Sequence, residues 1–102
     1  MTRPLRVFPQ AEAEMWDAAA YYESRREGLG VAFVDSIERT IHEILDAPNI
    51  GAPCVSDPRF RHRLVCRFPY RIMYQVSTER IEIAAIMHTS RRPGYWLGRV
   101  RS

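Results

Sequence analysis

Four side chains in the second half of the chain have types that could act on a phosphodiester: Arg71, His88, Arg92 and Tyr95. Cleavage of RNA without a metal needs a base for the 2′-hydroxyl, an acid for the leaving oxygen, and positive charge at the phosphate. The two guanidinium groups would supply the charge, and the imidazole and the phenol are the available proton-transfer groups. These catalytic candidates form an incomplete set, because no pair is committed to acid–base work.

Each of these residue types also has a structural interpretation. A hydrogen-bonded or solvent-facing histidine at a strand end, as expected for His88, is more common than a catalytic one. Arg71 lies in mid-strand and could pair with Glu82 across the sheet. Tyr95 and Trp96 have the bulk either to pack the tail onto the domain or to contact a partner. The residues alone leave these alternatives open.

Positive charge is concentrated in the second half of the chain. Residues 1–58 contain 5 arginines and 10 acids, whereas residues 59–102 contain 10 arginines and 2 acids, and the chain has no lysine. This asymmetry favours a polyanionic or acidic protein partner, with a solvated basic surface as the alternative. Strand alternation places Arg63, Arg67 and Arg71 on one sheet face. The tail extends this predicted partner-binding patch with Arg91, Arg92, Tyr95, Trp96, Arg99 and Arg101.

Several classes of protein have no motif in this sequence. Cys54 and Cys66 lack the spacing of a zinc or redox motif, so we expect no structural disulfide, with Cys66 a small core residue. Neither a His/Cys ligand cluster nor a Gly-rich phosphate loop occurs, which predicts no metal and no cofactor. No apolar run approaches the roughly 18 residues of a membrane span, and the first residues lack an apolar signal segment. We expect a cytoplasmic protein without a membrane partner.

The elements expected to position these residues begin with a short strand and two helices. Residues 5–8 form an apolar run closed by a proline, which predicts a first strand. Apolar residues then recur at spacings of three and four from Gln10, and Gly28 ends this first helix. A second amphipathic helix is predicted from about Gly30 to about Asp46. The short connection between them predicts an antiparallel hairpin.

After a Pro- and Gly-containing loop at residues 49–58, the apolar period changes to two. Three successive strands are predicted, joined by turns at residues 67–69 and 77–80, as an antiparallel meander. Leu64, Cys66 and Phe68 are expected on its apolar face, together with alternate residues of the next two strands. The helix hairpin must cover that face, which leaves Arg63, Arg67, Arg71 and His88 on the other. The whole chain, residues 1–102, is thus predicted to be one α+β domain with a basic C-terminal tail.

This order of elements resembles the RelE/ParE toxin superfamily over nearly the whole chain. The likeness rests on short motifs in a fixed order: Ala13-Glu14 with Tyr21-Tyr22-Glu23, Leu29-Gly30 with Phe33, Phe68-Pro69-Tyr70-Arg71, residues 83–88, and Arg91-Arg92-Pro93-x-Tyr95-Trp96. The Phe-Pro-Tyr-Arg motif and the tail resemble the ParE branch more than the RelE branch. Each motif is common by itself, and the joint order carries the resemblance.

The resemblance implies three functional hypotheses that the shared fold does not separate. A ParE-like toxin of a type II toxin–antitoxin system would poison DNA gyrase and form a hetero-oligomer with a ParD-like cognate antitoxin. A RelE-like enzyme would cleave mRNA on the ribosome without a metal; such enzymes also use lysines, which this chain lacks. A non-toxic relative would act only as a binding module. The missing lysines and the incomplete acid–base set favour the ParE-like hypothesis, in which the protein is not an enzyme.

Overall fold

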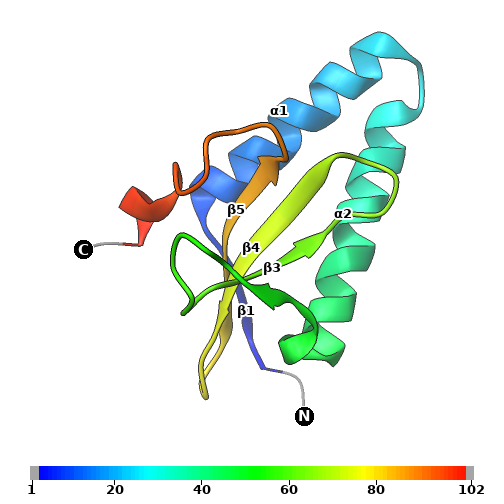
Figure 1. Ribbon diagram of the computed structural model, residues 1–102. Helices are drawn as coiled ribbons and strands as arrows, with labels where there is room; N and C mark the ends of the chain where they lie inside the picture. The colour runs from blue at the N-terminus through cyan, green and yellow to red at the C-terminus, as the bar shows by residue number, and fades with distance from the viewer. Residues whose placement is uncertain (1–2, 101–102) are drawn as a thin grey trace.

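The computed structural model describes residues 3–100, which form a five-stranded sheet with two long helices packed on one face (Figure 1). The strand order across the sheet is β1-β5-β4-β3-β2. In chain order the elements are β1 (Leu5–Val7), α1 (Pro9–Arg25), α2 (Leu29–Asp46), η1 (Pro48–Ile50), β2 (Ala52–Pro53), β3 (Arg61–Leu64), β4 (Tyr70–Val76), β5 (Ile81–His88) and η2 (Leu97–Arg99). The α+β class, the helix hairpin and the antiparallel meander are confirmed.

Two pairings extend the sheet beyond the predicted meander. β1 lies parallel to β5, with Leu5 opposite Ile81. β2 pairs antiparallel with β3, with Pro53 opposite Arg61, so the segment predicted as a loop contains a short edge strand. Strands of two or three residues are too short to show a periodicity in the sequence. The sheet is therefore mixed rather than purely antiparallel.

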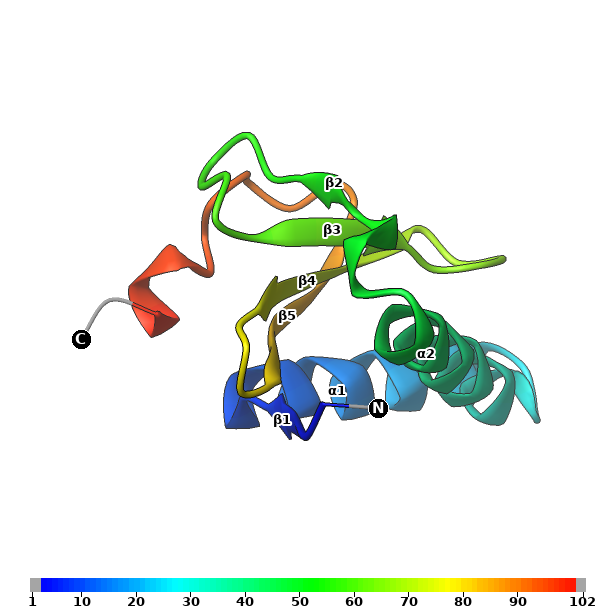
Figure 2. The same ribbon diagram turned by 90° about the horizontal axis from the view of Figure 1, so that it is seen from below.

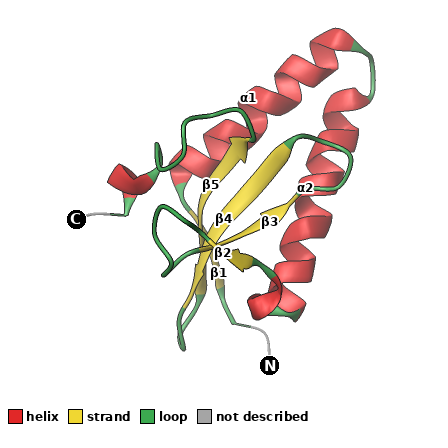
Figure 3. Cartoon of the chain, in the orientation of Figure 1, coloured by secondary structure: helices red, strands yellow, loops and turns green. Residues whose placement is uncertain are grey.

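The helix hairpin depends on two glycines, Gly28 in the connection between α1 and α2 and Gly30 in the first turn of α2 (Figure 3 shows the hairpin). Gly28 has a φ of 85°, a conformation that favours glycine. A Cβ atom at Gly30 would lie 2.6 Å from the carbonyl oxygen of Ala19, so only glycine allows the helices to approach this closely. The Glu23 carboxylate accepts hydrogen bonds from the backbone N–H groups of Gly28 and Gly30, each at 2.9 Å. In residues 3–100 no helix combines the length and the apolar composition needed to cross a bilayer.

A first hydrophobic core fills the space between the helices and the sheet (Figure 2). Both predicted helical stripes face it. Its fully buried side chains include Phe33, Ile37, Ile44, Ile72, Tyr74, Ile81 and Ile83, and Tyr22, Phe33 and Phe68 make close ring contacts within it. This burial is the main favourable contribution to holding the hairpin on the sheet.

A bulge between β4 and β5 changes which residues of β5 face the helices. Met73 lies opposite Ala85, whereas the next residue, Tyr74, lies opposite Ile83, so Ala84 has no partner in the register. The strict alternation predicted along β5 is therefore wrong beyond this point. The physical reason is that one extra residue in a strand moves every later side chain to the opposite face.

The sheet face opposite the helices carries a second core instead of an open row of arginines. Its buried members come from the β2–β3 loop, the sheet and the C-terminal segment: Cys54, Phe60, Met73, Ala84, Ala85, Met87 and Trp96. The rings of Phe60 and Trp96 are 5.0 Å apart. In Figure 2, the helices and the C-terminal segment reach the sheet from different sides. The tail thus folds over the sheet face on which the sequence predicted exposed arginines.

The predicted inward face of the first meander strand is wrong for two of its three residues. Leu64 is 58% exposed and Cys66 is exposed, whereas Val65, predicted to face outward, is buried; Phe68 is buried as predicted. β3 ends at Leu64, and Arg67 in the following turn has a positive φ of 73°, so the alternation does not continue to Phe68. The buried cysteine is Cys54, and both cysteines are free thiols.

We expect Trp96→Ala to destabilise the fold by about 3–5 kcal/mol, because the substitution removes the largest side chain of the second core. The matched control is Trp16→Ala, since Trp16 is 53% exposed on α1 and alanine suits a helix. Chemical denaturation followed by circular dichroism measures both values. Equal effects of the two substitutions would contradict a second core built around the tail.

Candidate functional site

The C-terminal segment is fixed to the body of the protein by one carboxylate, that of Glu14 on α1. Arg99 donates to both oxygens of Glu14 at 2.8 Å through Nη1 and Nη2, and the Tyr95 hydroxyl donates to Oε2. The backbone N–H of Ile86 donates to Oε1 at 3.0 Å, and Arg99 Nη1 also donates to the Ala84 carbonyl at 3.1 Å. The contacts join helix, strand and tail at one point.

The balance of forces on Glu14 favours its charged form. Burial by itself raises the pKa of a carboxyl group, but the hydrogen bonds from Arg99, Tyr95 and the Ile86 backbone outweigh it. The pKa of Glu14 is therefore lowered below its ordinary value of 4.5. The pKa of Tyr95 is raised by burial and by the adjacent carboxylate, so its hydroxyl stays protonated as a donor.

Three arginines at the end of the sheet are exposed, and the structure gives them no carboxylate partner: Arg67, Arg91 and Arg92. The Thr89 N–H donates to the Pro69 carbonyl at 2.8 Å, which places the β3–β4 turn beside the start of the tail. The Arg91 guanidinium stacks over the Tyr95 ring, 3.9 Å from its centroid. We call these three residues the basic end. Arg101 lies outside the described residues.

A groove of about 450 Å³ opens beside the basic end, between α1 and the end of β5. Three tyrosines line it, Tyr21, Tyr70 and Tyr95, and its polar groups include His88, Arg91 and the carboxylates of Glu14 and Asp17. His88 is held in place, because its Nδ1 accepts the Ser90 backbone N–H at 3.0 Å and its ring lies 5.2 Å from that of Tyr70. The neutral imidazole therefore carries its proton on Nε2.

The structure separates the four catalytic candidates. His88 and Tyr95 line the groove near α1, whereas Arg71 lies on the opposite sheet face, in a pocket beside Met73 and Met87. Arg92 is exposed in the tail. The Tyr95 hydroxyl is already bonded to Glu14. No two of them meet as an acid–base pair.

The predicted single patch of arginines is also divided. Arg63 lies on the helix side, where it meets Glu43 of α2 at 3.3 Å, because it stands opposite the inward-facing Ile72. Arg99 forms an ion pair with Glu14. Trp96 is 1% exposed, so it packs the tail onto the domain and offers no surface to a partner. Of the predicted partner-binding residues, Arg67, Arg91 and Arg92 remain available, with part of the Tyr95 ring.

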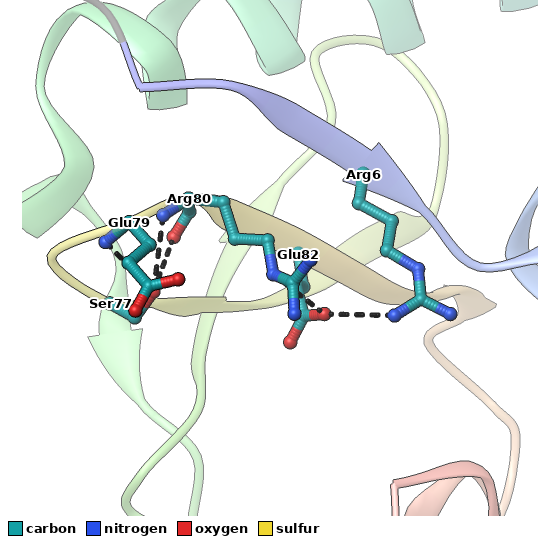
Figure 4. Close-up of polar contacts among 5 residues, drawn as sticks. All are labelled: Arg6, Ser77, Glu79, Arg80 and Glu82. Atoms are coloured by element: carbon teal, nitrogen blue, oxygen red, sulfur yellow. Dashed lines mark hydrogen bonds and ion pairs between the residues drawn. The ribbon is translucent and has the colours of Figure 1, made fainter.

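The possible pairing of Arg71 with Glu82 does not occur. Figure 4 shows Glu82 between Arg6 of β1 and Arg80, at 3.3 and 3.4 Å. Arg71 stands opposite Met87, far along β5 from Glu82. The parallel β1 strand, which the sequence did not pair with any other, supplies the first of these two partners.

Sequence reasoning missed Glu14 as the central residue of the site. In the sequence, Glu14 drew notice only as part of the Ala13-Glu14 motif. A detectable signal existed, because Glu14 lies three residues after Ala11 and four before Ala18, on the buried stripe of α1. An acid in that position requires a partner, and the arginine-rich tail is the obvious source.

Glu14→Gln should destabilise the fold by about 2–3 kcal/mol, because it removes the charge from several hydrogen bonds at a largely buried site. Glu38→Gln on the exposed side of α2 is the matched control, with an effect within about 0.5 kcal/mol. Denaturant titration of both variants measures the difference. Similar small effects for both would show that the Glu14 contacts do not stabilise the tail.

The stabilisation by Glu14 should also depend on pH. Because folding lowers its pKa, the contribution is complete above the ordinary value of 4.5 and is lost as the pH falls through the lowered value. The stability advantage of the native chain over Glu14→Gln should therefore be constant above the ordinary pKa of 4.5 and shrink as the pH falls below that value. An advantage that stays constant below that pH would contradict a lowered pKa.

Comparison with known proteins identifies the family. The model of the family described as "ParE toxin of type II toxin-antitoxin system, parDE" matches residues 5–93. Toxin ParE2 of Mycobacterium tuberculosis, in strains CDC 1551 / Oshkosh and ATCC 25618 / H37Rv, is 32% identical over 97 residues, which cover 91% of this chain and 88% of that protein.

A solved structure supports the fold. The structure described as the chromosomal ParDE TA system from P. aeruginosa matches with a TM-score of 0.69 at 21% identity, over 85% of this chain and 96% of that one. At this identity the likeness shows a shared fold. The family match over residues 5–93 and the 32% identity to toxin ParE2 confirm the resemblance to the ParE branch. The chain belongs to the ParE toxin family of type II toxin–antitoxin systems.

Proposed function

We propose that this chain inhibits growth by poisoning DNA gyrase and that a ParD-like antitoxin neutralises it in a hetero-oligomer. The observation that carries the proposal is membership of the ParE toxin family over nearly the whole chain. The structural neighbour is described as a ParDE system, which supports an antitoxin as the partner of this chain. The distribution of charged side chains supports one binding surface for gyrase and one for the antitoxin.

The basic end is the proposed surface for gyrase. Arg67, Arg91 and Arg92 are exposed at one end of the sheet, and none has a carboxylate within ion-pair distance among residues 3–100. Three unpaired positive charges close together attract a polyanion or an acidic surface, and they strengthen association most at low ionic strength. The fixed tail holds two of the three on a rigid support, which lowers the entropic cost of docking.

The arrangement of the catalytic candidates supports docking over RNA cleavage. Cleavage of the RelE kind requires a base, an acid and a cation around one phosphate. Here Arg71 and His88 lie on opposite faces of the sheet, and the Tyr95 hydroxyl is bonded to Glu14. A poison of gyrase needs a docking surface and no such set.

The groove beside the basic end is the proposed dock for the antitoxin. Its aromatic walls include Tyr21, which is 56% exposed, and Arg91 lies at its edge. An acidic and apolar segment that folds on binding would bury the rings and pair with the guanidinium. Such a segment would also cover part of the basic end, which explains how binding of the antitoxin would block binding of the toxin to its target.

Purified protein should inhibit supercoiling by DNA gyrase and increase the amount of cleaved DNA. The triple variant Arg67→Gln/Arg91→Gln/Arg92→Gln should be at least about tenfold less potent, because it loses the three unpaired charges. Potency is measured by gel assay of supercoiling and cleavage with gyrase holoenzyme.

The matched control is Arg25→Gln/Arg26→Gln/Arg39→Gln, which removes three exposed arginines from the helices with the same change in net charge. Equal loss of potency in both triple variants would contradict a role for the basic end. Codon-dependent cuts in mRNA on translating ribosomes, with gyrase unaffected, would establish the RelE-like alternative instead. Unchanged growth on expression without antitoxin would favour a non-toxic relative.

Tyr21→Ala should weaken binding of the antitoxin encoded beside this chain by at least about tenfold, because exposed aromatic anchors dominate such interfaces. Val31→Ala, at a 65% exposed apolar position on α2 outside the groove, should leave the affinity unchanged. Calorimetric titration of the two purified proteins measures both. The opposite pattern would place the antitoxin on the outer face of the helix hairpin.

A further inference from the structure

A small pocket lies on the sheet face opposite the helices, and of its lining residues the proposed function uses Arg91 alone. Its volume is about 190 Å³. The pocket lies between the β2–β3 loop and the tail, and its walls include His62 of β3, Arg71 of β4 and Arg91 of the tail. Gly94, with a φ of 79°, closes one side, since a Cβ atom there would lie 3.3 Å from Ser56 Oγ.

Two polar atoms beside this pocket are buried without a partner. They are His62 Nδ1 and Arg71 Nε, and neither makes a hydrogen bond with any part of the chain that the structure describes. The Arg71 side chain has no hydrogen bond or ion pair to residues 3–100 at all. Buried polar groups in folded proteins nearly always have partners, so an unpaired imidazole nitrogen beside an unpaired guanidinium nitrogen points to a missing ligand.

The charge of the residues that line the pocket indicates the charge of the missing ligand. Arg71, Arg91 and His62 line it, and no carboxylate does. Burial and then Arg71 lower the pKa of His62, as expected for a cation-forming group beside an unneutralised positive charge. The nearby Cys54 thiol stays protonated, because burial raises its pKa to about 11. An anion bound in the pocket would supply the negative charge that is missing beside His62, Arg71 and Arg91.

We propose that the pocket formed by His62, Arg71 and Arg91 binds a phosphate group. Residues with donor groups line the pocket from β3, from β4 and from the tail, and Ser56 and Thr89 also line it. Donors in several directions suit a tetrahedral oxyanion better than a planar carboxylate with two oxygens. The guanidinium fork of arginine binds phosphate oxygens in pairs. The volume of about 190 Å³ is enough for one such group. The site shares Arg91 with the basic end, whereas His62 and Arg71 have no part in the proposed action on gyrase.

The test is a titration of the full chain with inorganic phosphate at constant ionic strength. Binding should give a saturable shift of the His62 ring signals in NMR spectra and a change in Trp96 emission, read in a Trp16→Phe background because the chain has two tryptophans. Phosphate should also raise the pKa of His62 back toward its ordinary value of 6.5. The same response to another salt that replaces phosphate at equal ionic strength would overturn the proposal.

Arg71→Met keeps the aliphatic stem and removes the charge, so it should weaken phosphate binding at least about tenfold. Arg39→Met, at an exposed position of α2, is the matched control and should bind phosphate as the native chain does. His62→Gln is a second variant that should also weaken binding. Thermal unfolding with and without phosphate checks that each variant is folded. An unchanged affinity in folded Arg71→Met would overturn the proposal.

Two further ligands identify the source of the phosphate group. Tighter binding of dimethyl phosphate than of inorganic phosphate would support the site and assign it to the backbone of a nucleic acid. Tighter binding of inorganic phosphate would support the site and assign it to free phosphate or a phosphomonoester. Acetate binding tighter than both would overturn the proposal, since the pocket would then fit the acidic side chain of a protein partner.

Discussion

The bidentate ion pair between Glu14 and Arg99 is the constraint on which the rest of the structure depends. It joins the first helix to the last described turn, and the same carboxylate receives the Tyr95 hydroxyl and the Ile86 N–H. These contacts hold the tail across the sheet, where Trp96 completes the second core. Because the pair is largely buried, its loss would leave an unpaired charge as well as a loose tail.

The described arginines of the second half fall into two groups. Arg59, Arg61, Arg63, Arg80 and Arg99 are bound within the fold, to a backbone carbonyl or to carboxylates. Arg67, Arg71, Arg91 and Arg92 have no such partner, and the folded tail sets Arg91 and Arg92 beside the β3–β4 turn. Arg91 rests on the ring whose hydroxyl binds Glu14, so an internal contact positions a surface charge. Net charge alone therefore overstates the surface available to a partner.

Local periodicity predicted the helices and the meander because each apolar stripe repeats over many residues. Periodicity failed to predict which residues are buried where a bulge or a turn interrupts the repeat. The bulge at Met73 and Tyr74 reverses the faces of later β5 residues, and the positive φ at Arg67 ends the alternation before Phe68. The site was harder to predict because its contacts join distant parts of the chain. The pair between Glu14 and Arg99 spans 85 residues, and the unpartnered state of His62 and Arg71 emerges only when the tail closes the pocket.

The most direct test of this account asks whether gyrase binds the basic end that the anchored tail presents. Hydrogen–deuterium exchange of the full chain is measured for the protein alone and in complex with gyrase holoenzyme. Slower exchange is predicted in residues 65–69 and 88–93, which carry Arg67, Arg91 and Arg92, while the exposed side of α2 should exchange as in the free protein. Protection confined to the helix hairpin, with none in those two segments, would contradict the account.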